Sequence, residues 1–140
     1  MRPGRGTRCA FVSGMKAKNL NDLRVYRKAL EAADAISALL KRPAFGKDFD
    51  LKSQLSRSSA RVAPLTAEGY GQLTDRHVAV YLGRARGSVL ETLGHLVKAS
   101  REGFISPKEF SSATETYDHI GRMLTPWINY LQRSDWKQRG

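Results

Sequence analysis

Apolar residues recur at alternating three- and four-residue steps in four stretches of the chain, which glycine, proline and capping residues separate. This spacing gathers apolar side chains on one side of an α-helix. The first stretch predicts a helix over about residues 21–42, with Asn19 or Asn21 as its N-cap. Pro43 and Gly46, which disfavour helix, predict its end.

The first predicted helix carries two adjacent apolar stripes. One stripe is formed by Leu23, Tyr26, Leu30, Ala33, Ser37 and Leu40. The other is formed by Val25, Ala29, Ala32, Ile36 and Leu39. Two stripes give an apolar face wider than one pair of packed helices needs, so we expect an additional surface for self-association.

A second helix is predicted to begin near Asp48 or Asp50. Its apolar stripe consists of Leu51, Leu55, Ser58, Val62 and Leu65. Pro64 lacks a backbone N–H and clashes with the preceding turn, so we expect it to kink or end the helix. The glycines of residues 69–71 then predict a turn.

A third helix is predicted from Thr74 to about Arg101. Its apolar stripe consists of Val78, Leu82, Ala85, Val89, Leu93 and Leu96. The helix also contains Gly83, Gly87 and Gly94. Since glycine destabilises a helix by roughly 1 kcal/mol relative to alanine, we expect these three to allow close approach of a neighbouring backbone. Together with the second stripe of the first helix, this glycine face is expected to offer an additional surface for self-association.

The fourth helix has the clearest start, because Ser106 and Glu109 match a capping box with Pro107 at the first helical position. A heptad-like stripe follows, formed by Phe110, Ala113, Tyr117, Ile120, Leu124, Ile128 and Leu131. Such a rhythm is typical of left-handed bundle packing. Pro126 is expected to kink the last turns.

Four amphipathic helices with short connections predict an all-α fold, an antiparallel up-down-up-down four-helix bundle over residues 19–132. Residues 1–18 hold five basic and no acidic residues, so we expect a flexible basic tail. Met15 offers an alternative start, which would place residues 1–14 upstream of the protein. Residues 133–140 are expected to form a polar C-terminal tail.

The charge balance favours binding of polyanions. The chain has 24 Lys and Arg against 13 Asp and Glu, a formal net charge of +11. Without residues 1–14, which hold three arginines, 21 basic against 13 acidic residues leave +8. Phosphates neutralised by Lys or Arg release condensed counterions, which drives association. The alternative is a basic surface that serves solubility or an acidic protein partner.

Catalytic, metal and cofactor chemistry finds little support in the sequence. Cys9 is the only cysteine, which excludes an intramolecular disulfide and disfavours a zinc site. His77, His95 and His119 have no partner at ligand spacing, and residues 69–71 lack the pattern of a nucleotide-binding loop. No apolar run is long enough to span a membrane. We therefore expect a cytoplasmic protein without metal or cofactor.

Six cations on the second and third helices are candidate contacts to nucleic acid: Arg57, Arg61, Arg84, Arg86, Lys98 and Arg101. Cations about one turn apart can meet one run of phosphates. Five aromatic residues offer stacking surfaces or core positions: Tyr70, Tyr81, Trp127, Tyr130 and Trp136. The alternative for the cations is a solvated helix face.

Glu68 and Glu91 admit two interpretations. They could form a catalytic pair of carboxylates, or they could make interhelical ion pairs with nearby arginines. Bundles commonly use glutamates in the second way, so we favour the structural interpretation.

Several short motifs occur in a fixed order between about Leu20 and Leu131. The segment of residues 20–29 opens the series, and residues 103–106 and 120–124 end it. Between them lie Ala67, Glu68, Gly69, Tyr70 and Gly71, and then Ala85, Arg86, Gly87, Ser88 and Glu91. In these motifs the chain resembles the 23S rRNA intervening-sequence protein family. The resemblance implies a homopentamer of antiparallel four-helix bundles arranged as a barrel.

The resemblance also implies kinship with the accessory variability determinant of diversity-generating retroelements, a basic protein of the same fold and oligomer that binds nucleic acid and a reverse transcriptase. Two positions depart from the family pattern. The family usually has its proline one residue before Pro64, and it commonly has a basic residue in place of Gln72. The kink and any phosphate contact at this turn are therefore expected to differ.

Our leading hypothesis is a non-enzymatic, oligomeric nucleic-acid-binding protein. In its narrowest form, the protein is an accessory factor to a reverse transcriptase in a diversity-generating retroelement. The rival hypothesis is a structural or protein-interaction module with no nucleic-acid role.

Overall fold

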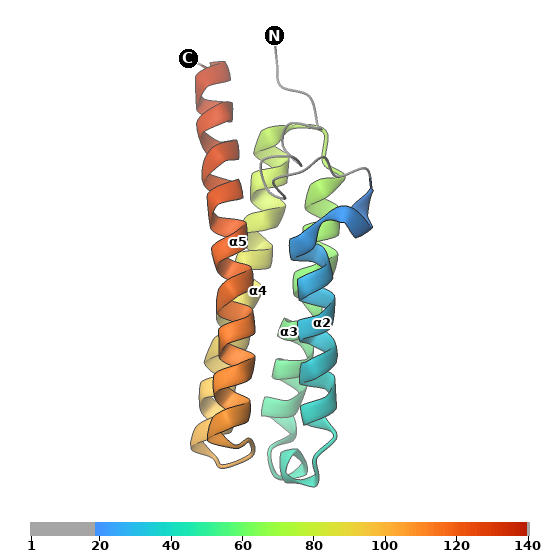
Figure 1. Ribbon diagram of the computed structural model, residues 1–140. Coiled ribbons are helices and arrows are strands. Elements are labelled where there is room, and N and C mark those ends of the chain that lie inside the picture. Colours follow the sequence, from blue (N-terminus) through green and yellow to red (C-terminus); the bar gives the residue numbers. More distant parts are fainter. Residues whose placement is uncertain (1–18, 140) are drawn as a thin grey trace.

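Four long helices lie side by side in an antiparallel bundle (Figure 1). They are α2 (Arg24–Leu40), α3 (Phe49–Tyr70), α4 (Asp75–Arg101) and α5 (Pro107–Arg139), with short 3₁₀ turns η1 (Leu20–Asp22) and η2 (Pro43–Lys47). This computed structural model describes residues 19–139, without the side chains of Asn21 and of residues 135–139. No strand occurs in that range, so the prediction of an all-α four-helix bundle is confirmed. The predictions for residues 1–18 lie outside it.

The neighbours of each helix close the bundle. Each long helix packs against the next one in sequence, and α2 also packs against α5. The most extensive contacts join α3 to α4 and α4 to α5, so α4 lies diagonally across from α2. None of the helices described is apolar over a length that could cross a membrane.

The first long helix begins later than the sequence predicted. Residues 20–22 form η1, where the Asn19 N–H donates to Asp22 Oδ2 at 3.2 Å. Leu23 is the N-cap of α2 and is fully buried, and no side chain caps this end of the helix. Burial of Leu23 therefore anchors the start of α2 where an asparagine cap was expected.

Three predicted helix starts are confirmed, and a side chain caps each of them. Asp48 Oδ1 accepts from the N–H three residues on at 3.0 Å, and Thr74 Oγ1 accepts in the same way at 3.2 Å. At α5, Ser106 Oγ accepts from the Glu109 N–H at 3.1 Å and Glu109 Oε1 accepts from the Ser106 N–H at 2.8 Å. These reciprocal bonds make up the expected capping box.

Pro64 does not end α3, which was one of the two effects expected of it. The helix continues to Tyr70, and Gly71 is its C-cap, so the expected turn at residues 69–71 moves to residues 71–74. Proline cannot donate to the carbonyl of the residue four positions earlier, which here is Ala60. Both Pro64 and Ala60 are exposed, and water can satisfy that carbonyl.

α5 also runs past its predicted end. It contains Pro126 and continues to Arg139, so the segment from Arg133, which was expected to be a tail, is helical. Pro126 is exposed, and the helix tolerates it for the same reason as α3 tolerates Pro64.

The core takes most of one apolar stripe of α2 and only the two ends of the other, Leu23 and Leu40. In the stripe that starts at Val25, Ala29 and Ile36 are also buried, whereas in the other Leu30 is 42% exposed. The other long helices contribute the buried side chains of Leu51, Leu55, Val62, Val78, Leu82, Ala85, Val89, Leu96, Tyr117, Ile120, Leu124, Trp127, Ile128 and Leu131. The sequence stripes of α3, α4 and α5 therefore supply most of the core, as predicted.

Hydroxyl groups line part of the core between α3, α4 and α5. Thr92 Oγ1 lies 2.9 Å from Ser58 Oγ and 2.8 Å from the Ser88 carbonyl oxygen. The Tyr117 hydroxyl is buried and makes no hydrogen bond of good geometry within the described part of the chain. Burial raises the pKa of Tyr117 well above its usual range, and the Ser59 side chain opposes part of this rise. The tyrosine therefore stays neutral in the folded protein.

The close approach of two helices occurs at Gly69. A Cβ at this position would lie 3.2 Å from both Tyr81 Cβ and Leu82 Cδ2, so α3 and α4 touch here. The prediction placed close approach at the glycines of α4 instead, namely Gly83, Gly87 and Gly94. All three have nothing within 4 Å of a Cβ, so no other helix of the described chain approaches them, and the expected role of this face in self-association stays a prediction.

An ion pair joins the end of α2 to the start of α5. Arg42 Nη1 donates to Glu109 Oε1 at 2.7 Å, and Nη2 contacts the second carboxylate oxygen. The Ser106 N–H and, after it, the Arg42 guanidinium hold the pKa of Glu109 below its usual value. The capping box of α5 is thereby tied to another helix.

We predict that Gly69→Leu destabilises the fold, because the added side chain must enter the contact with Tyr81 and Leu82. Overpacking of this kind costs about 1–3 kcal/mol. Urea unfolding followed by circular dichroism measures the change. The matched control is Ala60→Leu on the exposed side of α3, which should stay within about 0.5 kcal/mol of the native protein. Equal stability of the two variants would contradict the contact.

Glu109→Gln should destabilise the protein at pH 7 and destabilise it less at pH 3. Because the fold lowers the pKa of Glu109 from 4.5, the carboxylate stabilises the fold above that value and loses this effect as the pH falls through the folded pKa. Urea unfolding at both pH values is the measurement. The control is Glu115→Gln, an exposed position of α5 outside the capping box. A destabilisation that is equal at pH 7 and pH 3 would contradict the argument.

Candidate nucleic-acid interface

The six candidate cations lie on α3 and α4, and all of them are exposed. The structure brings them together only in part. Arg57 borders a groove between α2 and α3, whereas Arg86 borders a groove between α4 and α5. Lys98 and Arg101 occupy the last turn of α4. The cations are therefore distributed over several faces of the bundle.

Two of the six are already held in ion pairs. Arg61 Nη2 lies 2.7 Å from Glu91 Oε2, which joins the middle of α3 to the middle of α4. Lys98 Nζ lies 3.7 Å from Asp48 Oδ2, at the end of the bundle where α3 begins. A phosphate would have to compete with these carboxylates, so Arg61 and Lys98 are weaker candidates than the sequence suggested.

The other four cations are free of carboxylates. Among residues 19–139, Arg57, Arg86 and Arg101 have neither an ion pair nor a hydrogen bond through their side chains. Arg84 places its guanidinium 5.2 Å from the centre of the Tyr81 ring, a cation–π contact that leaves its N–H groups available. These four side chains carry most of the uncompensated charge of α3 and α4.

Arg84 and Arg86 point to opposite sides of α4. Two positions along an α-helix differ by about 200° in direction. Arg84 accompanies Tyr81 on the side that faces α3, and Arg86 lies on the side that faces α5. One straight phosphate backbone cannot contact both side chains at the same depth.

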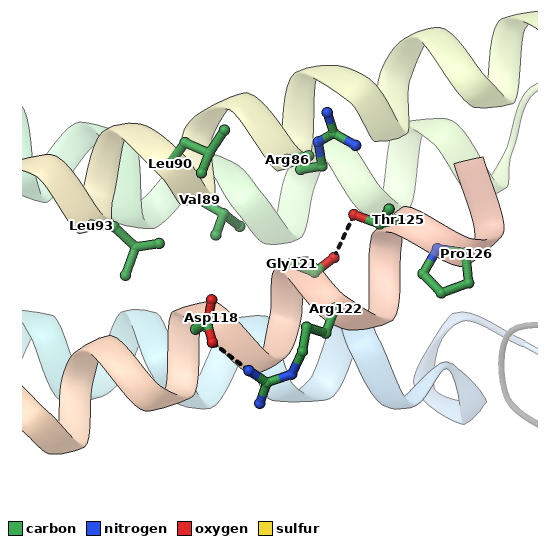
Figure 2. Close-up of a pocket in the computed structure, with 9 residues that line it drawn as sticks. All are labelled: Arg86, Val89, Leu90, Leu93, Asp118, Gly121, Arg122, Thr125 and Pro126. Atoms are coloured by element: carbon green, nitrogen blue, oxygen red, sulfur yellow. Dashed lines mark hydrogen bonds and ion pairs between the residues drawn. The ribbon is translucent and has the colours of Figure 1, made fainter. Parts of the chain in front are cut away.

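A groove of about 560 Å³ lies between α4 and α5 (Figure 2). Its walls are formed by Arg86, Val89, Leu90, Leu93, Asp118, Gly121, Arg122, Thr125 and Pro126. The groove is mainly apolar, with charged groups at its rim. Arg122 bonds to Asp118 one turn before it on α5, and Thr125 Oγ1 donates to the Gly121 carbonyl at 2.9 Å.

Arg122 is a residue that the sequence analysis missed. It belongs to a motif of the fourth helix, yet only the folding of α5 against α4 brings it to the same groove as Arg86. The spacing of Asp118 and Arg122 by four residues was the available signal, since it predicts an ion pair on one helix face.

The family-like motif residues divide into packing and surface positions. Gly69 and Ser88 are buried, and the Ser88 carbonyl accepts from Thr92. Glu91 holds Arg61, whereas Arg86 and Gly87 are exposed. Glu68, Tyr70 and Gly71 form the last turn and the C-cap of α3. The motif residues are therefore divided between packing and surface positions, and they do not form a single binding face.

Gln72, which departs from the family pattern, has a structural role. Its Nε2 donates to the Glu68 carbonyl at 3.0 Å, which satisfies one of the free carbonyls at the end of α3. The other departure from the family pattern is the position of Pro64. Thr66, two residues later, is buried, and its Oγ1 donates to the Val62 carbonyl at 2.8 Å. Both polar side chains donate to backbone carbonyls of α3.

Glu68 and Glu91 do not form a carboxylate pair. Gly69 lies beside Leu82, and Arg61 lies beside Glu91, so the antiparallel register places Glu68 about two helical turns from Glu91. Two turns correspond to about 10 Å along the bundle. This distance and the Arg61 partner favour the interhelical ion pair over a catalytic role for Glu91.

Most of the candidate aromatic and metal-binding residues either have other contacts or lie far from one another. Trp127 is 1% exposed and belongs to the core, so it offers no stacking surface. His77 Nδ1 lies 2.8 Å from Thr74 Oγ1, and His95 Nε2 lies 4.0 Å from Glu91. Within the described ranges, no three His, Cys, Asp or Glu residues gather as metal ligands would. The side chain of Trp136 is outside the described part.

Comparisons with known proteins identify one family and one similar fold. The family described as 23S rRNA-intervening sequence protein matches residues 21–126. Among solved structures, a protein of unknown function from the S23 ribosomal protein family of Bacteroides thetaiotaomicron is similar, with a TM-score of 0.70 and 23% sequence identity. The similarity covers 74% of this chain and 97% of that chain, and at this identity it supports the fold alone. No protein with a curated description matches.

The Arg61–Glu91 ion pair should contribute little to stability, because both side chains are about half exposed. Double-mutant cycles of such pairs give about 0.2–1 kcal/mol. The cycle consists of Arg61→Gln, Glu91→Gln and the double variant, each unfolded in urea. A coupling energy near zero would show that Arg61 is free to bind other anions, contrary to its placement as a paired residue.

Proposed function

Because this chain belongs to the 23S rRNA-intervening sequence protein family, we propose that it is a non-enzymatic, self-associating bundle that binds nucleic acid through distributed cations. The observation that carries the proposal is the set of exposed cations without carboxylate partners: Arg57, Arg84, Arg86 and Arg101. Residues 19–139 keep 19 of the 24 basic residues and all 13 acidic ones, a net charge of +6.

Distributed cations imply a particular mode of binding. Each arginine that meets a phosphate releases counterions, whichever base the phosphate carries. The described helices present no recognisable element for reading bases in a groove. Association is therefore expected to depend strongly on salt and weakly on sequence.

Self-association would turn weak contacts into useful affinity. Each chain offers a few cations. Once one chain of an oligomer has bound a nucleic acid, the other chains meet the same molecule at a high effective concentration, which raises the overall affinity. The number of chains that we propose, five, comes from the family resemblance alone. The exposed apolar residues of α4 favour self-association without fixing that number.

A narrower proposal makes the protein an accessory factor of a reverse transcriptase. It rests on the resemblance to the accessory variability determinant and on no contact within this chain. Co-purification with a reverse transcriptase encoded beside the gene is the direct test.

The second candidate function is a protein-interaction module without a nucleic-acid role. The observation in its favour is the exposure of Val80, Leu90 and Val97 on α4, beside an apolar groove. Exposed apolar patches of this kind mark protein contacts more often than nucleic-acid contacts. The two candidates differ in their response to salt, because apolar contacts do not weaken as salt rises.

We predict that the double variant Arg57→Gln/Arg101→Gln weakens oligonucleotide binding equally across unrelated sequences. Both guanidinium groups are exposed and unpaired, so each is available to a phosphate. The slope of log affinity against log salt should become shallower by about 0.9 for each duplex phosphate that the variant no longer neutralises. Fluorescence anisotropy at several salt concentrations measures both effects.

The matched control is Arg61→Gln/Lys98→Gln, which removes the same charge from ion-paired positions. Its effect on affinity and on the salt slope should be smaller. Equal reductions in affinity for the two double variants would mean that net charge alone governs binding, and would contradict the assigned sites.

A further inference from the structure

A groove of about 380 Å³ lies between α2 and α3, at the end of the bundle where η2 joins the two helices (Figure 1). Its walls carry the C-cap residue of α2, Lys41, and three residues from the first turns of α3, namely Phe49, Lys52 and Arg57. The volume lies within the range of about 300–1,000 Å³ that is usual for small-molecule sites. We call it the α2–α3 groove.

The α2–α3 groove carries positive charge that no acidic group offsets. No carboxylate of the described chain lines it, whereas the wall of the groove between α4 and α5 includes Asp118. Within residues 19–139, Lys41, Lys52 and Arg57 take part in no ion pair and in no side-chain hydrogen bond. Like charges gathered in one groove repel one another, and an anion placed between them removes that repulsion. The groove therefore suits an anionic ligand.

The acidic residues nearest to the groove in the sequence do not neutralise these cations. Asp48 is the N-cap of α3, and Lys98 pairs with it at 3.7 Å. Asp50 Oδ2 accepts from Gln54 Nε2 at 2.8 Å. Asp34 lies about two turns before the end of α2 and is not part of the wall. The charge of the groove is therefore available to a ligand from outside the chain.

Phe49 gives the groove an exposed aromatic wall. It is the first residue of α3 and is 77% exposed, the largest exposed fraction among the large hydrophobic side chains described. The fold of one chain therefore does not require a ring at this position. Beside three cations, a phenyl ring in contact with water offers a flat apolar surface on which a nucleobase can stack.

Three hydroxyl groups complete the groove. Ser37, Ser53 and Ser56 line it, and their Oγ atoms make no hydrogen bond to another part of the described chain. A hydroxyl can donate to a phosphate oxygen and can accept from a sugar or a base. Cations, hydroxyls and an aromatic ring in one groove match the phosphate, the sugar and the base of one nucleotide.

The ring of Phe49 distinguishes an unpaired strand from a duplex. The bases of a duplex are stacked on one another and present only their edges in the grooves, so their faces are closed to the ring. In a single strand, a base can leave the stack and lie against an aromatic side chain. Cations alone would bind the phosphates of both forms. The aromatic wall therefore favours the unpaired strand.

We propose that the α2–α3 groove binds one unpaired nucleotide of a single-stranded nucleic acid, with its base stacked on Phe49 and its phosphate held by the three cations. This site rests on the proposed function and narrows its ligand from nucleic acid in general to unpaired strands. Stacking accepts any base, so the groove adds no preference for sequence. In an oligomer, one strand can occupy the grooves of several chains.

Phe49→Ala tests the stacked base, because it removes the ring and leaves every charge in place. Fluorescence anisotropy with the full chain compares a labelled strand of about 16 nucleotides with the blunt duplex that this strand forms with its complement. The variant should bind the strand about fivefold or more weakly, with an unchanged salt slope. Its affinity for the duplex should not change. The matched control is Leu73→Ala, which removes a 70% exposed side chain between α3 and α4 and should alter neither affinity.

Two results of this comparison overturn the proposal. One is an equal loss of affinity for strand and duplex, and the other is no loss for the strand. Light scattering should give the native mass for both variants. A lower mass for Phe49→Ala alone would place the ring in a contact between chains, and the proposal would then be wrong as well.

The double variant Lys41→Gln/Lys52→Gln tests the phosphate. It should weaken binding of the strand and make the slope of log affinity against log salt shallower by about 0.7 for each phosphate that is no longer neutralised. The control is Lys28→Gln/Lys108→Gln, which removes the same charge from α2 and α5 outside the groove. Equal effects of the two double variants would show that the groove has no special role.

Phe49→Trp gives a signal from the groove itself. A base stacked on the indole quenches its fluorescence, so the strand should lower the emission of this variant more than that of the native protein, whose tryptophans are Trp127 and Trp136. Polyphosphate, a polyanion without bases, should bind without this additional quenching. Equal quenching by the strand and by polyphosphate would mean that the groove stacks no base, and would refute the proposal.

These measurements separate the groove from the proposed function. If the native protein and Phe49→Ala bind strand and duplex alike, with a steep dependence on salt, distributed cations bind nucleic acid and the groove is wrongly assigned. If the native protein binds neither form at low salt, the nucleic-acid role is wrong and the groove proposal falls with it. A loss confined to the strand, together with quenching at position 49, supports both.

Discussion

The close packing of α3 against α4 sets the orientation of everything else in the bundle. Gly69 lets α3 approach Tyr81 and Leu82, and the Ser58–Thr92 hydrogen bond fixes the register of the two helices. With that side of α4 committed to α3 and the adjacent side committed to α5, its glycines and Leu90 are left facing solvent. The exposed arginines and apolar residues of this helix are therefore consequences of how α4 is packed.

The sequence predicted the fold well where one physical signal dominated. Helical periodicity located four helices, and the capping side chains of Asp48, Thr74 and Ser106 located three of their starts. The sequence-based prediction failed where the outcome depended on whether a residue is exposed in the folded bundle. Pro64 was expected to end a helix, but its solvent-facing position lets water satisfy the carbonyl that it leaves free. Periodicity also does not show which of the two α2 stripes supplies most of the core residues of that helix.

The candidate site was less predictable, because the local sequence does not show which side chains form ion pairs between helices. Arg57 and Arg61 are one turn apart and look equivalent, yet only Arg61 meets a carboxylate across the bundle. Arg84 and Arg86 were both candidates and are close in sequence, yet they face opposite sides of α4. The glycines of α4 predicted close approach of a neighbouring backbone, but no other helix within the described chain comes near them. Their expected role in self-association stays a prediction.

The central claim is that uncompensated cations on a helical scaffold bind nucleic acid through its phosphates. Titration of the native protein with unrelated single- and double-stranded oligonucleotides, from low to physiological salt, tests it most directly. The account predicts similar affinities for unrelated sequences of equal length, and a linear fall of log affinity with log salt. No association at low salt, or tight binding to one sequence that salt does not weaken, would contradict it.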